Sequence, residues 1–173
     1  MPDFPLSDNI DFFNKVSFFN TLDTAELQDV VAATMVAYYP AGERIIRMGE
    51  AAGGYLYVVQ TGCARVTITD ESGEELLVDF RVESDNFGAV SLLKGGNALF
   101  NVTAEEDLID FLIPKATMDN LLKMHPTFQR YFGFSLSRNF KAVRKSADDP
   151  LNLLSRDNQH QVDMFMSGKK AGN

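Results

Sequence analysis

Three glycine-containing segments decide the fold: Pro40-Ala41-Gly42-Glu43, Met48-Gly49-Glu50 and Leu56-Tyr57-Val58-Val59-Gln60-Thr61-Gly62. The glycine of each segment follows a short run of β-branched, aliphatic or aromatic residues, which favour strands. Glycine adopts the positive φ angles of sharp corners without a steric penalty. The segments therefore predict tight turns between short strands and a β-rich unit.

The same character extends outward on both sides, from about residue 36 to residue 114. Val66 and Ile68 alternate with polar neighbours, as in a strand with one buried face. Short runs bounded by Gly, Asp, Asn and Ser predict seven strands: Met35–Tyr39, Arg44–Arg47, Tyr55–Gln60, Ala64–Thr69, Leu76–Val82, Phe100–Thr103 and Leu108–Ile113. Seven short strands indicate a mainly β fold, a double-stranded β-helix or jelly roll, here called the β-roll.

Helical spacing flanks the β-roll on both sides. Before it, residues 10–35 predict two short helices, and Asp23 with Glu26 three residues later forms a capping-box signal between them. After it, residues 116–147 predict a helical pair, with Pro126 in the first turn of the second helix. That helix has a stripe of apolar residues at intervals of four: Phe128, Phe132, Leu136 and Phe140.

Length and composition indicate one soluble domain. Of the 173 residues 45% are hydrophobic and 23% are charged, the balance of an ordinary folded protein. We expect a domain over residues 10–147 and a linker or tail over residues 148–173. A single cysteine, Cys63, cannot form an internal disulfide, and the sequence shows neither a signal peptide nor a membrane span. These observations predict a cytoplasmic protein with no membrane partner.

The charge is unevenly distributed along the chain. Residues 1–122 hold 7 Lys or Arg against 20 Asp or Glu, whereas residues 123–173 hold 9 against 4. We interpret the basic segment as a solvated face that offsets the acidic body. Only 26 residues follow Ala147, too few for a three-helix DNA-binding module, so no DNA partner is predicted.

The ordered glycine segments identify a resemblance when they are read with three later ones. Asn86-Phe87-Gly88, Val102-Thr103-Ala104 and Leu112-Ile113-Pro114 follow them, and the whole set resembles the cyclic nucleotide-binding domain family over residues 12–143. The resemblance implies a β-roll, a short helix that holds a phosphate-binding cassette, and two C-terminal helices that transmit the signal. It implies a regulatory domain and no enzymatic activity.

The cassette implied by the resemblance runs from Phe87 to Ala104 and departs from the family at its key positions. The family has a glutamate for the ribose hydroxyl where this chain has Ala89, and a proline and an arginine for the cyclic phosphate at the positions of Asn97 and Ala98. Ordinary cyclic AMP binding is therefore not expected. The implied ligand-binding positions are Phe87, Gly88, Ala89, Val90, Ser91, Lys94, Asn97, Ala98 and Leu99.

Three functions remain open. The first is a sensor for a nucleotide-like or anionic ligand, held by the helix start at Gly88 and by Lys94. The second is a ligand-free dimerisation module whose pocket is filled by Leu99 and Phe100. The third is a cupin-type metalloenzyme, which the histidines disfavour because both lie outside the β region. An open cavity beside Gly88 with Lys94 or Arg81 directed into it would favour the first.

Two features of the sequence predict binding partners: the apolar stripe of the C-terminal helix, and a resemblance to one group of proteins within the family. The stripe from Phe128 to Phe140 either packs on its own β-roll or forms the seam of a homodimer, and Tyr131 and Phe134 lie off that stripe. The segments Leu112–Lys115 and His125–Phe128 resemble bacterial signalling proteins in which such a domain precedes CBS and nucleotidyltransferase-like regions. Residues 162–166 resemble the start of a CBS domain.

Overall fold

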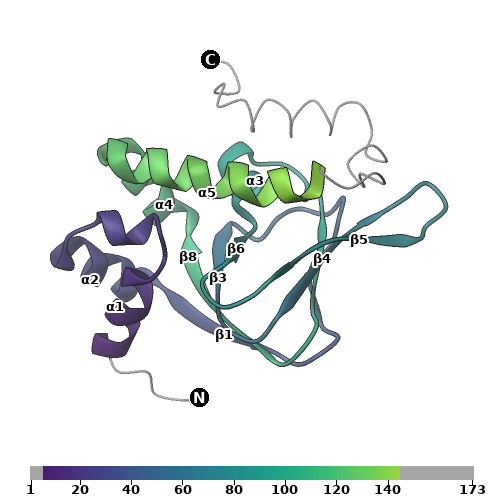
Figure 1. Ribbon diagram of the computed structural model, residues 1–173, viewed down its shortest axis with the longest axis horizontal. Helices are drawn as coiled ribbons and strands as arrows, with labels where there is room; N and C mark the ends of the chain where they lie inside the picture. The colour runs from purple at the N-terminus through teal and green to yellow at the C-terminus, as the bar shows by residue number, and fades with distance from the viewer. Residues whose placement is uncertain (1–5, 145–173) are drawn as a thin grey trace.

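The computed structural model describes residues 6–144, with the side chains of residues 7–139. Two four-stranded antiparallel sheets form the β-roll, and helices cover one side of it (Figure 1). The first sheet has the order β1-β8-β3-β6 and the second β2-β7-β4-β5. The strands are β1 (Met35–Tyr39), β2 (Arg44–Ile46), β3 (Tyr55–Thr61), β4 (Ala64–Thr69), β5 (Glu75–Arg81), β6 (Asn86–Phe87), β7 (Asn101–Ala104) and β8 (Leu108–Pro114).

The fold class and the seven predicted strands are confirmed. Every predicted strand boundary lies within one residue of the observed one. The prediction missed β6, because a strand of two residues is too short to show any alternation. That strand nevertheless positions the cassette, since Val58 pairs with Asn86 and Tyr57 with Phe87.

The helices are α1 (Leu6–Asn14), the 3₁₀ turn η1 (Phe19–Thr21), α2 (Thr24–Ala33), α3 (Ala89–Lys94), α4 (Lys115–Met124) and α5 (Pro126–Arg144). The predicted capping box is present: the Glu26 N–H donates to Asp23 Oδ1 and the Asp23 N–H donates to Glu26 Oε2, both at 2.8 Å. α1 begins four residues before the predicted helical segment. The expected linker at residues 148–173 lies outside the described residues.

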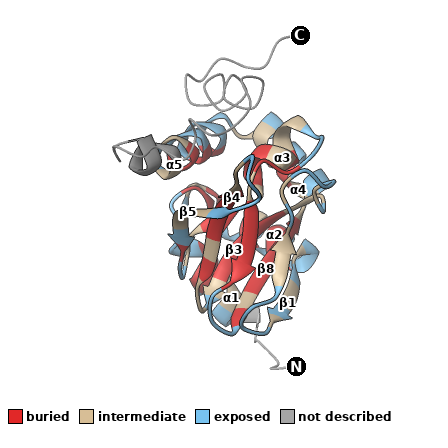
Figure 2. Cartoon of the chain, turned by 90° about the vertical axis from the view of Figure 1, so that its right-hand side faces the viewer, coloured by how far each residue is buried: buried red, intermediate tan, exposed pale blue. Residues whose placement is uncertain are grey.

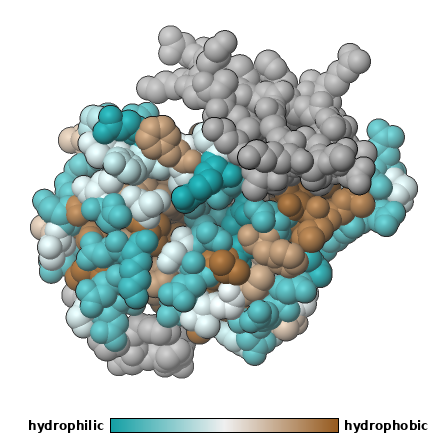
Figure 3. Space-filling view, viewed as in Figure 1, coloured by the Kyte–Doolittle hydropathy of each residue, from teal (hydrophilic) through white to brown (hydrophobic). Residues whose placement is uncertain are grey.

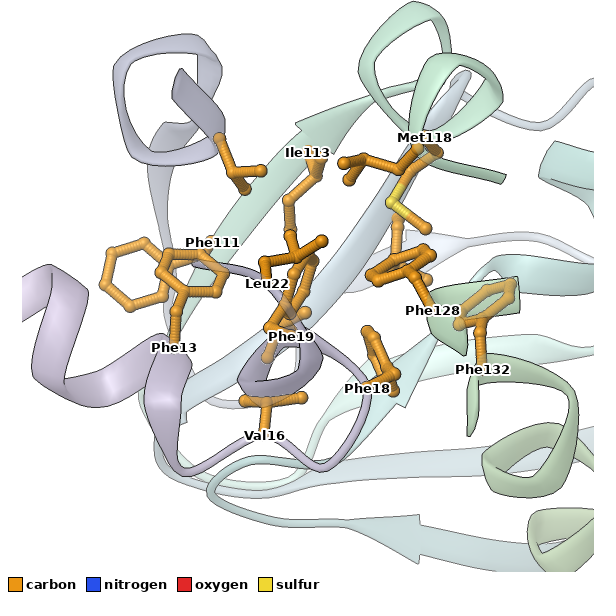
Figure 4. Close-up of a cluster of buried hydrophobic side chains, with 14 of the residues drawn as sticks. Phe13, Val16, Phe18, Phe19, Leu22, Phe111, Ile113, Met118, Phe128 and Phe132 are labelled. Atoms are coloured by element: carbon orange, nitrogen blue, oxygen red, sulfur yellow. The ribbon is translucent and has the colours of Figure 1, made fainter. Parts of the chain in front are cut away.

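An aromatic cluster joins the N-terminal helices to α5 (Figure 4). Phe18 and Phe19 from the segment between α1 and α2 pack against Phe128 and Phe132 of α5. Phe111 of β8 closes the cluster from the sheet side, where it contacts α1. These rings are almost fully buried, so the cluster fixes the first half of α5 to the rest of the domain.

The apolar stripe on α5 therefore packs on the chain's own core. Phe128, Phe132 and Leu136 are 0%, 1% and 3% exposed, whereas the side chain of Phe140 lies outside the described residues. The buried residues form a band through the centre of the β-roll, along β3 and β8, and the exposed ones lie at its edges (Figure 2). Phe128, Phe132 and Leu136 thus agree with the interpretation in which the stripe packs on its own chain.

One corner depends on glycine. Gly62, between β3 and β4, has a φ of +97°, and a Cβ there would collide with the main-chain oxygen of Asp107. The hairpin at this corner can therefore close only without a side chain. This confirms the sequence argument for a sharp turn at this position.

Candidate functional site

A cavity of about 640 Å³, counted out to the solvent at its mouth, lies among the β-roll, α3 and α5. Five strands and both helices contribute to its wall. Most of the wall is aliphatic, from the side chains Ile46, Val66, Val78, Leu99, Val102 and Leu136. An apolar cavity with a few polar groups is the usual form of a small-molecule site.

Helix α3 begins at the edge of this cavity because of a glycine. Gly88 precedes α3 with a φ of +83°, and its oxygen accepts a hydrogen bond of 3.1 Å from the Leu92 N–H. A Cβ on Gly88 would lie 3.0 Å from the Tyr57 ring and 3.1 Å from the Tyr55 oxygen. The Tyr57 ring stacks in turn on Phe87, with 4.7 Å between the ring centroids. The glycine thus lets α3 approach β3 closely.

Seven of the nine predicted ligand-binding positions lie on the cavity wall. These are Phe87, Gly88, Ala89, Val90, Ser91, Ala98 and Leu99. Lys94 and Asn97 do not: Lys94 lies at the last turn of α3, and Asn97 is exposed in the bridge that it forms with Ala51. Leu99 and Phe100 also lie on the wall.

The two alanines of the cassette are both on the wall. Ala89 is 3% exposed and Ala98 is 5% exposed. They present methyl groups where the resemblance implies a carboxylate for a ribose hydroxyl and a guanidinium for a cyclic phosphate. The wall therefore has neither of the two charged groups that the resemblance implies at these positions.

Arg81 is the charged residue among the described residues that line the cavity. It is 8% exposed and its guanidinium is already engaged. Nε donates to the Asn86 oxygen at 3.1 Å and Nη1 donates to the Phe80 oxygen at 3.1 Å. Nη1 also forms an ion pair with Asp79. Through its two bonds to main-chain oxygens, Arg81 supports the loop before β6. Because Asp79 balances its charge, Arg81 contributes little net charge to the cavity.

The polar residues Asn86 and Asn139 were not predicted as site residues. Asn86 begins β6 and Asn139 lies on α5, four residues beyond Ser135, whose hydroxyl accepts a hydrogen bond of 3.4 Å from Asn86 Nδ2. The signal for Asn86 was present in the sequence as a polar residue directly before Phe87-Gly88. For Asn139 there was none, because only the packing of α5 on the β-roll brings it to the cavity.

A second buried polar group lies inside the β-roll, away from the cavity wall. Asp110 of β8 is fully buried, and neither carboxylate oxygen has a hydrogen-bond partner within the described chain. Burial raises the pKa of this carboxyl to about 8. Burial also raises the pKa of Tyr39 and that of Tyr57, which lie near it on the neighbouring strands. Asp110 is therefore largely protonated at neutral pH.

Residues 6–144 contain no group of three or more His, Cys, Asp or Glu side chains placed to hold a metal ion. None of the helices in that part of the chain combines the length and the apolar character needed to span a lipid bilayer.

Comparison with known proteins places this geometry in a family. Residues 36–125 match the family described as "Cyclic nucleotide-binding domain". A curated relative, the cAMP-dependent protein kinase regulatory subunit of Blastocladiella emersonii, is 28% identical over 112 residues, which are 65% of this chain and 28% of the relative. The chain thus spans less than a third of the length of that relative.

Solved structures share the fold. The sensor domain of the transcriptional regulator DNR from Pseudomonas aeruginosa superposes with a TM-score of 0.69 at 16% identity, over 82% of this chain and 95% of that one. The regulatory subunit of a cAMP-independent protein kinase A from Trypanosoma cruzi, bound to guanosine, superposes with a TM-score of 0.65 at 23% identity, over 94% and 50%.

The match covers more than half of the chain, and it includes the β-roll, the cassette helix α3 and the whole of α4. The antiparallel sheets and the cavity beside α3 agree with it. The chain belongs to the cyclic nucleotide-binding domain family, whose members are regulatory ligand-binding domains.

Proposed function

We propose that this chain is a non-catalytic sensor domain whose cavity binds an uncharged, nucleoside-sized ligand in place of a cyclic nucleotide. The observation that carries the proposal is the charge of the wall. Its described charged residue, Arg81, is already paired with Asp79, and alanines occupy positions 89 and 98. A phosphate would enter this cavity without a cation to balance it, which is strongly unfavourable in an apolar site.

The neighbour bound to guanosine supports the choice of ligand class. That protein has the same fold and holds a nucleoside without a phosphate. The cavity here has aliphatic walls for a flat ring and the uncharged polar residues Asn86, Ser91 and Asn139 for its edges. The occupant would contact α5 through Leu136 and Asn139, so occupancy would be communicated to the C-terminal helix.

A thermal-shift series tests the proposal. The purified protein is heated with guanosine, inosine, adenosine, cyclic AMP, cyclic GMP or AMP, each at a saturating concentration. A ligand at 100 times its dissociation constant adds about 2.7 kcal/mol of stability, a rise of about 5 to 10 °C in melting temperature. We expect the rise with a nucleoside and not with cyclic AMP. A rise with the cyclic nucleotides alone would refute the proposal, as would no rise at all.

A homodimer through α5 is a second proposal, and it rests on different side chains from the buried stripe. Tyr131 and Phe134 are 42% and 62% exposed, and their rings contact each other with centroids 6.1 Å apart. Exposed aromatic side chains of this kind are enriched in interfaces. We expect sedimentation to show a dimer that Phe134→Ser disrupts and that Met124→Ser, a matched change of another exposed apolar residue, does not. A monomeric wild-type protein would refute it.

Hydrophobic side chains also gather on the β5 side of the molecule (Figure 3). The exposed apolar residues of this region include Leu77, Phe80 and Val82.

A bacterial source, a cytoplasmic location and an association with CBS or nucleotidyltransferase-like domains stay predictions from the sequence.

A further inference from the structure

Asn86 has an unsatisfied polar atom at the cavity. The residue is 3% exposed and lines the cavity, and its Oδ1 has no hydrogen-bond partner within the part of the chain that the structure describes. A buried acceptor without a partner destabilises the folded state, because it has lost its hydrogen bonds to water. A ligand that donates a hydrogen bond to Oδ1 would remove that destabilisation.

The rest of the residue is held on both sides. Its main-chain oxygen accepts a hydrogen bond of 3.1 Å from Arg81 Nε, and its main chain pairs with Val58 across β3 and β6. Its Nδ2 donates to Ser135 Oγ of α5 at 3.4 Å. These contacts restrict the rotation of the carboxamide, and they leave Oδ1 as a buried acceptor without a partner in the described chain, on a residue of the cavity wall.

The surroundings of Asn86 specify what kind of donor fits. The cavity wall that includes Asn86 also includes the apolar residues Phe87, Leu136 and Val102, and its described cation, Arg81, is paired with Asp79. A charged ammonium donor would be buried there without a carboxylate partner. An uncharged N–H at the edge of a flat heterocycle has the required chemistry, and its ring would lie against the apolar wall.

We infer that Asn86 is a specificity-determining residue, whose Oδ1 accepts a hydrogen bond from an N–H donor on the base of a nucleoside-like ligand. The inference rests on the proposed function and adds the recognition group and the ligand feature that it reads. The same carboxamide touches Ser135, so the group that recognises the base is also bonded to α5.

Two variants test the inference by calorimetric titration with guanosine, inosine and adenosine. Asn86→Leu keeps the approximate shape of the side chain and removes the acceptor. We expect it to weaken binding of the best of these nucleosides by at least 10-fold, because the donor of the base is then buried without a partner. Asn120→Leu is the matched control: it makes the same change at an exposed asparagine of α4 that is not on the cavity wall, and it should change the affinity by less than 3-fold.

The unliganded proteins provide a second readout. Asn86→Leu removes an unsatisfied acceptor, so its melting temperature without ligand should equal or exceed that of the wild-type protein. A large fall in melting temperature would show that Asn86 is a structural residue and would overturn the inference. Equal nucleoside affinity of Asn86→Leu and the wild-type protein would overturn it as well.

A ligand pair makes the test independent of any variant. Purine riboside lacks the N–H donors on the base of adenosine, guanosine and inosine, and we expect the wild-type protein to bind it at least 10-fold more weakly than the best of those three. Equal binding would overturn the role of Asn86 while the proposed function stands. Binding of none of the nucleosides would refute the proposed function, and the specificity role with it.

Discussion

The ring of Phe18 meets the ring of Phe132 edge to face, with 5.0 Å between their centroids and 76° between their planes. Phe18 lies before α2 and Phe132 lies on α5, so this contact joins the two ends of the described chain. Both rings are 1% exposed. The contact belongs to the cluster that holds α5 against the domain.

Phe132→Ala should destabilise the domain by about 3 to 5 kcal/mol, the usual result of truncating a buried phenylalanine. Denaturant unfolding followed by far-ultraviolet circular dichroism measures the change. Met124→Ala, which truncates an exposed apolar residue at the end of α4, is the control and should change stability by less than about 0.5 kcal/mol. Equal effects of the two changes would contradict the observed packing of α5.

Asp110 should make stability fall as pH rises. Burial raises the pKa of its carboxyl to about 8 in the folded protein, whereas the unfolded value is 3.8. The stability that the protonated form contributes is thus fully present below about pH 4 and is lost as pH rises toward 8. Asp110→Asn, which is neutral at every pH, should remove this slope. Unfolding free energies measured between pH 4 and pH 9 test it.

The comparison of Asp110→Asn with the wild-type protein isolates this carboxyl from the other acids. The neighbouring phenols of Tyr39 and Tyr57 stay neutral over that pH range, because burial raises the pKa of each. Parallel pH profiles for the two proteins would show that Asp110 titrates at its ordinary pKa.

Restoring two family residues should restore cyclic AMP binding. Ala89→Glu and Ala98→Arg place a carboxylate and a guanidinium on the cavity wall, where the family pattern has them. A hydrogen bond to a charged group contributes about 1.5 to 3 kcal/mol, so the double variant should bind cyclic AMP at least 10-fold more tightly than the wild-type protein. Isothermal titration measures both affinities.

The matched control for that gain is Ala89→Gln with Ala98→Met, which adds similar volume without charge. We expect no gain of cyclic AMP binding from it. If both double variants bound cyclic AMP equally, the missing charges would not explain the preference of the cavity.

The capping box at α2 should contribute about 1 kcal/mol to the free energy of unfolding. Asp23→Ala leaves the Glu26 N–H without its acceptor and should lower the unfolding free energy by about that amount. Asp29→Ala, an exposed acid later in the same helix, changes the charge equally and should have a smaller effect. Urea unfolding of both variants distinguishes capping from net charge.

The strands and the capping box could be predicted from the sequence because their signals are local. Alternation along residues 64–69 and glycines at corners such as Gly62 depend on neighbouring residues only. β6 escaped prediction because two residues carry no period. Phe128 and Phe132 are buried, as the spacing predicted. The spacing alone could not say whether they pack on the chain's own core or on a second subunit.

Only the part of the site that lies within the cassette of the family could be predicted from the sequence. The resemblance located the positions from Phe87 to Leu99, most of which lie on the wall. It could not place Arg81 with Asp79, nor bring Asn139 of α5 to the cavity, because those relations arise from the closure of the β-roll and from helix packing.

Gly133 lies between the aromatic residues of α5 that pack in the core and the residues of α5 that line the cavity. Phe128 and Phe132 precede it in the aromatic cluster, and Leu136 and Asn139 follow it on the cavity wall. Glycine is the weakest helix former after proline, and no neighbouring atom lies within 4 Å of the place where a Cβ would stand. Leu136 belongs to the same buried cluster as Phe128 and Phe132 and also lines the cavity, so the packed face of α5 continues past the glycine, and an occupant of the cavity would touch a side chain of the aromatic-rich core itself.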